Sequence, residues 1–238
     1  MLTRQAFATC ENFGVMTFVF QFRVLTFLLV ILGGCSSTRP TTSEPWEVAA
    51  QRPELNAPID VNDFHADLIA RAIYEETNVI RRDLHLRPFG QLHRLDEAAD
   101  IQASTNALGA TAAHSNIVTA WASPSDRVRS VGLTPRLVSE NVALIAIFDV
   151  DPSHGYNERT TDTGRVVVDG ITGTPLLPHT YVSFARAIVR AWMNSPGHRA
   201  NIVNPEYHYL GCSARPTRSV TGFQMMSGAQ VFFTPMGE

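Results

Sequence analysis

Residues 191–202 read AWMNSPGHRANI and are the most informative stretch of the chain. Ser195 followed by Pro196 is typical of a helix start, because serine can cap a helix and proline fits its first position. We therefore expect one helix to end at residue 194 and a short second helix to begin here. His198 would lie in the first turn of the short helix, where the positive helix end disfavours imidazolium and keeps the ring neutral.

Regular patterns continue on both sides of this stretch. The preceding segment places Phe184, Ile188 and Trp192 at four-residue steps, which predicts a packed helix. Downstream, residues 207–214 and 223–234 are rich in apolar, β-prone side chains. They predict two paired strands that close a sheet.

Three further helices are expected earlier in the chain. They begin at Asn62 or Asp63 and end before Pro88, cover residues 96–109, and cover residues 126–131 with Ser125 as N-cap. Their apolar residues recur near the helical period, which predicts that each helix packs one face against a core.

A strand and an insertion separate these helices from the residues quoted first. Residues 137–147 (LVSENVALIAI) predict a buried strand. Residues 149–179 break the pattern with Gly, Pro, Thr and Asp and predict an insertion, within which residues 165–172 fit a hairpin turning at Asp169-Gly170. Helices and strands that do not alternate as βαβ units favour an α+β domain layered around an antiparallel sheet.

Composition and charge limit the classes of function. The chain has 238 residues, of which 45% are hydrophobic and 17% charged, so it can form one packed domain with appendages. Its formal net charge is −3, and it shows no basic stripe of the kind that nucleic-acid binding requires. We therefore expect no nucleic-acid partner.

The first 34 residues have the features of a secretory signal peptide. An uncharged apolar run over residues 24–34 follows Arg23 and is too short to span a bilayer comfortably. The run ends in Leu-Gly-Gly before Cys35, a pattern similar to the lipobox of bacterial lipoproteins, in which the cysteine is acylated. A true start at Met16 would give a signal peptide of ordinary length. The alternative is an incidental thiol beside a simple anchor helix.

Acylation of Cys35 would hold the mature chain on a membrane, because two or three acyl chains give a stable attachment. Residues 35–62 are rich in Ser, Thr and Pro and predict a flexible tether, so the folded domain would cover residues 63–238. The expected location is extracytoplasmic. In a Gram-negative host the outer membrane is favoured, since Ser36 stands where lipoproteins kept at the inner membrane often carry aspartate.

Three motifs occur in a fixed order along the chain: His114-Ser115, SENVA at residues 139–143, and WMNSPGHRANI at residues 192–202. This order resembles the CAP superfamily of cysteine-rich secretory proteins, antigen 5 and plant pathogenesis-related proteins, and especially its cysteine-poor bacterial branch. The resemblance covers about residues 65–235. It implies a three-layer α-β-α sandwich with a cleft lined by two histidines and two acidic residues, which holds a divalent cation in some members.

The resemblance places His114, Glu140 and His198 in this cleft, whereas the second acid of the family falls on Ser195. Two imidazoles and a carboxylate are ligand types of open zinc sites, so a zinc or magnesium ion is a candidate cofactor. The leading expectation is a lipid-anchored envelope protein that binds a small ligand, lipid, glycan or peptide in this cleft, either directly or through the cation.

Three other interpretations stay open at the level of sequence. Glu140 and the two histidines could form a hydrogen-bonded polar core that ties a strand to helices. Glu140, His198 and Ser195 could serve an envelope hydrolase acting on peptide or cell-wall substrates, although a capping serine already uses its oxygen on backbone N–H groups. Finally, a non-catalytic surface protein could contact a partner through residues 149–179.

Overall fold

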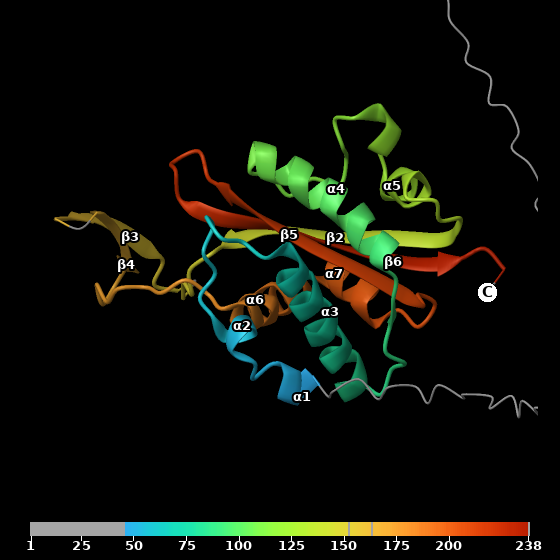
Figure 1. The fold of residues 1–238 in the computed structure, drawn as a ribbon, viewed down its shortest axis with the longest axis horizontal. Coiled ribbons are helices and arrows are strands. Elements are labelled where there is room, and N and C mark those ends of the chain that lie inside the picture. The colour runs from blue at the N-terminus through green and yellow to red at the C-terminus, as the bar shows by residue number, and fades with distance from the viewer. Residues whose placement is uncertain (1–45, 152, 163, 238) are drawn as a thin grey trace, which may run out of the picture. The chain divides into compact units, whose positions relative to one another are not determined.

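A four-stranded sheet in the order β1-β5-β6-β2 forms the middle layer of the fold (Figure 1). In this computed structural model, residues 46–151, 153–162 and 164–237 are described. The strands are β1 (Gly90–Gln91), β2 (Pro135–Ala146), β5 (Tyr209–Arg218) and β6 (Gln224–Pro235). The three long strands are antiparallel, and the two-residue β1 pairs with β5 in parallel. The strands expected near residues 137–147, 207–214 and 223–234 are confirmed.

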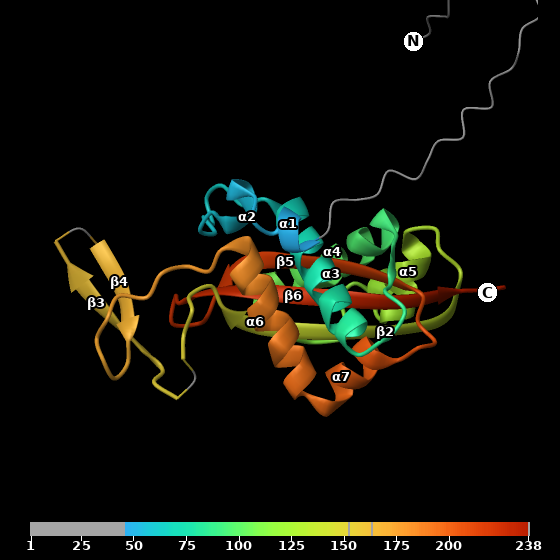
Figure 2. The same ribbon diagram turned by 90° about the horizontal axis from the view of Figure 1, so that it is seen from below.

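Helices cover both faces of the sheet (Figures 1 and 2). One face carries α3 (Ala66–Asp83), α6 (Tyr181–Asn194) and α7 (Pro196–Val203), and the other carries α4 (His93–Gly109), the 3₁₀ turn η1 (Thr119–Trp121) and α5 (Pro124–Ser130). The fold is therefore the α+β, α-β-α sandwich that the sequence predicts.

Each face of the sheet has its own hydrophobic core. Because successive side chains of a strand point to opposite faces, Phe232 packs into the core under α3 and α6, whereas Phe233 packs into the core under α4 and α5. The predicted helical stripe is confirmed, since Phe184, Ile188 and Trp192 of α6 are all buried in the first core. Close packing of the second layer depends on one position without a side chain.

Gly211 of β5 is this position. A Cβ atom here would lie 2.1 Å from the carbonyl carbon of Leu95, so only glycine lets the backbone of α4 approach the strand this closely. The approach is held by a hydrogen bond, because the backbone N–H of Cys212 donates to Asp96 Oδ1 at 2.9 Å. Asp96 is therefore an internal residue of α4 that contacts the sheet, and the prediction that the helix begins at Asp96 is wrong by three residues.

The other helix starts also differ from the sequence-based expectation. The first long helix follows His65, whose backbone N–H donates to Tyr181 Oη at 3.0 Å, and not Asn62 or Asp63. The cap of α5 is Ser123 rather than Ser125. Ser123 Oγ accepts the backbone N–H of Asp126 at 3.2 Å, and the Asp126 carboxylate accepts the backbone N–H of Ser123 at 3.0 Å. This reciprocal pair is a capping box.

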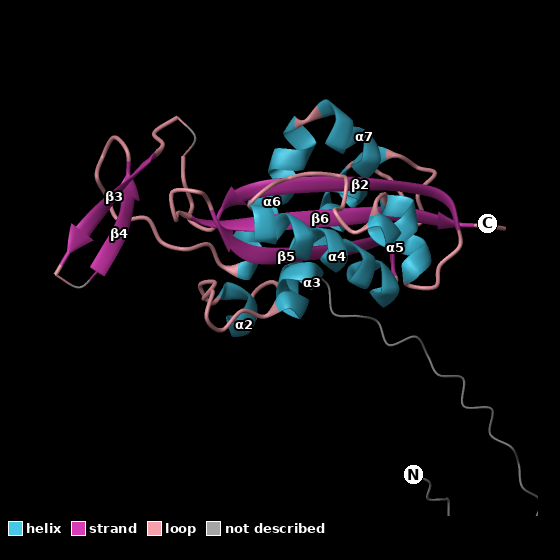
Figure 3. Cartoon of the chain, turned by 90° about the horizontal axis from the view of Figure 1, so that it is seen from above, coloured by secondary structure: helices cyan, strands magenta, loops and turns pink. Residues whose placement is uncertain are grey.

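The insertion forms a separate hairpin at one end of the sheet (Figure 3). Its strands are β3 (Tyr156–Thr161) and β4 (Gly164–Asp169), so the chain reverses between Thr161 and Gly164 and not at Asp169-Gly170. The physical reason lies in Asp169, whose Oδ1 accepts the backbone N–H groups of Ile171 and Thr172 at 3.0 and 2.7 Å. This aspartate fixes the turn by which the chain leaves the hairpin.

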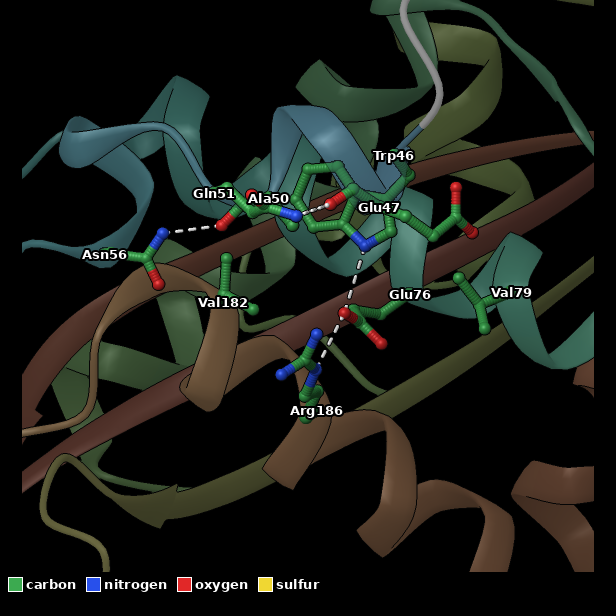
Figure 4. Close-up of a pocket in the computed structure, with 9 residues that line it drawn as sticks. All are labelled: Trp46, Glu47, Ala50, Gln51, Asn56, Glu76, Val79, Val182 and Arg186. Atoms are coloured by element: carbon green, nitrogen blue, oxygen red, sulfur yellow. Dashed lines mark hydrogen bonds and ion pairs between the residues drawn. The ribbon is translucent and has the colours of Figure 1, made fainter.

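Residues 46–62, which we call the N-terminal strap, are folded and not a tether. They contain the short helices α1 (Trp46–Ala49) and α2 (Pro53–Asn56), and they bury Trp46, Leu55 and Ile59 in the core with α3 and α6. The Trp46 indole Nε1–H donates to Glu76 Oε1 of α3 at 3.0 Å (Figure 4). The domain boundary expected at residue 63 is therefore too late, because three apolar anchors outweigh the polar composition around them.

The predicted signal peptide at residues 1–34, the alternative start at Met16, Cys35 and the part of the predicted tether up to residue 45 lie outside the described residues. Among the helices that are described, none combines the length and the apolar character needed to cross a bilayer.

Candidate functional site

Glu140 lies near the middle of β2, which is one of the two edge strands of the sheet. One side of β2 is paired with β6, and near Glu140 the strand is approached by residues of α7 and of the loop after α4. Asn201 of α7 donates its side-chain N–H to the Glu140 carbonyl oxygen at 3.3 Å, and His114 approaches from the loop after α4. The predicted site residues therefore meet over the edge of the sheet.

A buried arginine that the sequence analysis missed holds the Glu140 carboxylate. Arg127 of α5 donates from Nη2 to Glu140 Oε1, and their side chains are 0% and 1% exposed. The same guanidinium donates to the carbonyl oxygens of Trp121 at 2.8 Å and His114 at 3.4 Å. Arg127 thus connects the acid, the loop of the first histidine and the turn before α5.

His114 carries the exposed half of this cluster. Its Nδ1–H donates to Glu140 Oε2 at 3.2 Å, while its side chain is 54% exposed. The hydrogen bond to Glu140 is the main reason why the pKa of His114 is raised, because it stabilises the imidazolium form. The preceding residue is fixed by two buried amides of α4, since Gln102 and Asn106 donate to the Ala113 carbonyl oxygen at 2.6 and 2.9 Å.

His198 lies on α7 beside His114, with ring centroids 6.3 Å apart and an angle of 51° between the ring planes. Partial burial, and secondarily the positive charge of His114, lowers the pKa of His198. The direction agrees with the expectation of a neutral ring, although burial rather than the helix end is the leading cause. The two imidazoles therefore have opposite protonation preferences.

A chain of buried amides positions α7 against the sheet. Asn141 donates from Nδ2 to the His198 carbonyl oxygen and to Gln230 Oε1, both at 3.1 Å, and accepts from Asn201 at 2.8 Å. Gln230 in turn donates to Thr77 of α3 at 2.7 Å. The motif residue Asn141 is thus a positioning residue, and the expectation of a polar network that ties strand to helices is met by Asn141 as well as by Glu140.

Ser195 does not complete a hydrolytic triad. It precedes α7 at the N-cap position, but its side chain makes no capping hydrogen bond, so the expectation that capping uses its oxygen is wrong. Glu140 contacts His114 and Arg127, and within the described residues no hydrogen bond joins Ser195, His198 and the acid. Glu140 orients His114, the histidine that is not part of the triad interpretation.

The residues present do not fit the cation that the family resemblance implies. Both oxygens of Glu140 are engaged, one by the guanidinium of Arg127 and one by His114. By the family resemblance, the position of the second acid is occupied by Ser195. Only the two imidazoles then remain as ligands in this cluster, whereas open zinc sites use three protein ligands. Within the described residues, no three His, Cys, Asp or Glu side chains are grouped closely enough to hold a metal ion.

Two hollows in the described part have linings that do not include His114 or His198. One, of about 350 Å³, is lined by residues of α6 and α7 that include Met193 and Arg199. The other, of about 610 Å³, lies between the strap and helices α3 and α6, where Glu76 accepts hydrogen bonds from Trp46 and Arg186 (Figure 4). The His114–His198 pair is instead a surface feature over the sheet edge.

These features define an α-β-α domain that presents two histidines over one edge of its sheet, backed by a buried carboxylate. The family model described as "CAP: Cysteine-rich secretory protein family" matches residues 74–232, more than half of the chain, and the chain belongs to this family. No curated protein matches it.

Three solved bacterial structures are similar to this chain at low sequence identity. An outer surface protein of Borrelia burgdorferi is 15% identical with a TM-score of 0.46, over 76% of this chain and 98% of that one. An extracellular protein of Bacillus anthracis with an SCP domain is 17% identical with a TM-score of 0.44, over 71% and 41% of the two chains. A cysteine-rich secretory protein of Staphylococcus aureus is 15% identical with a TM-score of 0.42, over 71% and 39%. The chain thus spans about two fifths of the length of the latter two proteins.

Proposed function

We propose that this CAP-family protein is an extracytoplasmic, lipid-anchored protein of the bacterial envelope that binds an oxygen-rich ligand directly on His114 and His198. The observation that carries the proposal is the pair of imidazoles at a ring separation of 6.3 Å, with the His114 side chain 54% exposed. The raised pKa of His114 and the lowered pKa of His198 support it. At one pH, His114 can donate a charged hydrogen bond while His198 offers a lone pair. A ligand with an acceptor and a hydroxyl or amide donor side by side would satisfy both rings.

The charges around the pair favour a neutral or anionic ligand. Arg127 and Glu140 compensate each other, so protonated His114 adds the remaining positive charge. Glycans, peptide carboxylates and lipid headgroups of the envelope offer suitable oxygens. A hydrolytic role has less support, because a carboxylate sealed against Arg127 is poorly placed to activate a water molecule.

The test uses the processed chain, residues 35–238 carrying Cys35→Ser, and the NMR signals of its histidine rings. The chain is titrated with soluble cell-wall glycopeptide fragments, short peptides and phospholipid micelles. We expect one of these classes to shift the ring signals of both His114 and His198 in a saturable manner. His114→Ala and His198→Ala should each weaken binding while His93→Ala, which changes an exposed ring on α4, leaves it unaltered. Failure of all three classes to shift the pair would refute the proposal.

Lipid anchoring is tested separately. Growth with a labelled fatty acid should label the wild-type chain, and Cys35→Ser should abolish the label and release the chain from the membrane fraction. A label that persists in Cys35→Ser would exclude the proposed anchor.

The insertion at residues 149–179 favours one further candidate role, contact with another protein. Ile171 and Leu177, which lie in the insertion, are 70% and 75% exposed. Changing both residues to Asp should leave the unfolding midpoint unchanged and abolish capture of an envelope partner by chemical cross-linking. Unchanged capture would remove this role.

A further inference from the structure

We propose that Arg127 is a built-in counter-ion that takes the electrostatic place of a divalent cation, so that the His114–His198 site works without metal. The inference rests on the proposed function only in that it concerns the same two histidines. It requires no knowledge of the ligand.

The first argument is the position of the guanidinium. Arg127 Nη2 reaches both Glu140 Oε1 and the His114 carbonyl oxygen, and Nη1 holds the Trp121 carbonyl oxygen. A cation that bound Glu140 would have to stand close to this positive group. Because the carboxylate and the guanidinium are almost fully inaccessible, their interaction is screened little by water. Mutual repulsion therefore excludes a second cation while Arg127 is in place.

The second argument is that Arg127 is costly in a purely structural role. Its Nε is buried and has no hydrogen-bond partner, although such groups are normally paired. Replacing a buried ion pair by apolar residues of similar size is often neutral or stabilising. The pair therefore has a use beyond stability, and its geometry shows one: Arg127 holds Glu140 Oε1 while Oε2 accepts from His114 Nδ1, which leaves the other ring nitrogen of His114 for the ligand.

The third argument is the set of groups that remain. By the family resemblance, Ser195 stands where a second acid would lie, so around the two imidazoles the described residues do not offer a cation the charge of two carboxylates. Glu140 is the single acid of the cluster, and Arg127 neutralises it. Removing Arg127 would free the carboxylate beside two imidazoles, which are the ligand types of an open zinc site. As the three side chains now lie, they are not grouped closely enough to hold an ion, so the freed carboxylate would have to move toward the imidazoles to bind one.

The experiment compares divalent-cation binding by the processed chain and three variants, using calorimetry with Zn²⁺ and Mg²⁺. Arg127→Gln removes the charge, and Arg127→Lys keeps it. Arg129→Gln is the matched control, because Arg129 lies on the same helix with a 61% exposed side chain paired only with Asp126. Circular dichroism establishes that each variant is folded.

We expect Arg127→Gln to bind Zn²⁺ about tenfold to a hundredfold more tightly than wild type, the range by which groups around a metal site commonly change its affinity. Arg127→Lys and Arg129→Gln should retain wild-type affinity, and Glu140→Gln added to Arg127→Gln should remove the gain. A folded Arg127→Gln chain without the gain would overturn the proposal.

A second measurement needs no variant that could fail to fold. The wild-type melting temperature should not respond to an excess of Mg²⁺ or Zn²⁺, since a ligand that binds only the native state raises it. A rise that EDTA reverses, together with zinc-induced shifts of both the His114 and His198 ring signals, would overturn the proposal. Binding of envelope ligands in EDTA is a separate readout, so failure of the proposed function is distinguishable from failure of this inference.

Discussion

Replacing the two members of the buried ion pair singly and together gives the sharpest energetic test of the site. With side chains 0% and 1% exposed, Arg127 and Glu140 have no access to compensating water once a partner is lost. Removing one partner of a buried pair costs about 3–5 kcal/mol, whereas apolar replacement of both is close to neutral. We therefore expect Arg127→Met and Glu140→Leu each to lower the free energy of unfolding by about 3–5 kcal/mol.

The double variant should be destabilised by less than about 3 kcal/mol, well short of the sum of the single changes. Urea unfolding followed by circular dichroism measures all four corners of this cycle, with Arg129→Met as the exposed control. If the losses of unfolding free energy were additive in the double variant, they would refute the view that the two charged side chains stabilise each other. Single losses below about 1 kcal/mol, the range of exposed pairs, would show that the pair is hydrated in solution.

Three other outcomes follow from contacts described above. Gly211→Ala places a Cβ 2.1 Å from the Leu95 carbonyl carbon and should cost about 1–3 kcal/mol or more in urea unfolding, whereas Gly197→Ala, with nothing within 4 Å, should cost nothing. NMR titration should show the pKa of His114 above the ordinary value and that of His198 below it. The stability from His114 is complete below the unfolded-state pKa and is lost as pH rises through its raised value, while His198 destabilises the fold as pH falls below the unfolded-state pKa; a shared, unshifted titration would contradict both. Trp46→Phe should cost about 1 kcal/mol by removing the hydrogen bond to Glu76, and Trp46→Ala about 3–5 kcal/mol, measured in the same way. A negligible cost for Trp46→Phe would show that packing alone holds the strap, and equal costs would show that ring packing adds nothing beyond the hydrogen bond.

Elements with a regular apolar period could be predicted from the sequence, and single contacts between distant segments could not. The stripe of Phe184, Ile188 and Trp192 identifies α6 because burial of one helical face repeats every three to four residues. The sequence predicts Ser125 as the N-cap of α5 instead of Ser123, because both residues are serines and either could cap a helix. Only the reciprocal bonds with Asp126 distinguish them.

The same limit applies to the site. His114, Glu140 and His198 were found from motifs, but nothing local marks Arg127 as buried. Arg129, two residues away on the same helix, is 61% exposed. The difference in exposure arises because folding brings Glu140, a strand residue 13 positions along the chain, next to Arg127 and not next to Arg129. An acid without an obvious partner in a predicted buried strand was the available signal, since such an acid needs a counter-charge.

The folded strap changes how far the protein could range from a membrane. If Cys35 carries the acyl chains, eleven residue steps separate it from Trp46, the first described residue of the strap. This connecting segment can span at most roughly 40 Å. A connecting segment that extended from Cys35 to residue 63 would span on the order of 100 Å. The domain would therefore stay within a short distance of the lipid surface. Ligands farther from the membrane would have to diffuse to it before they could bind.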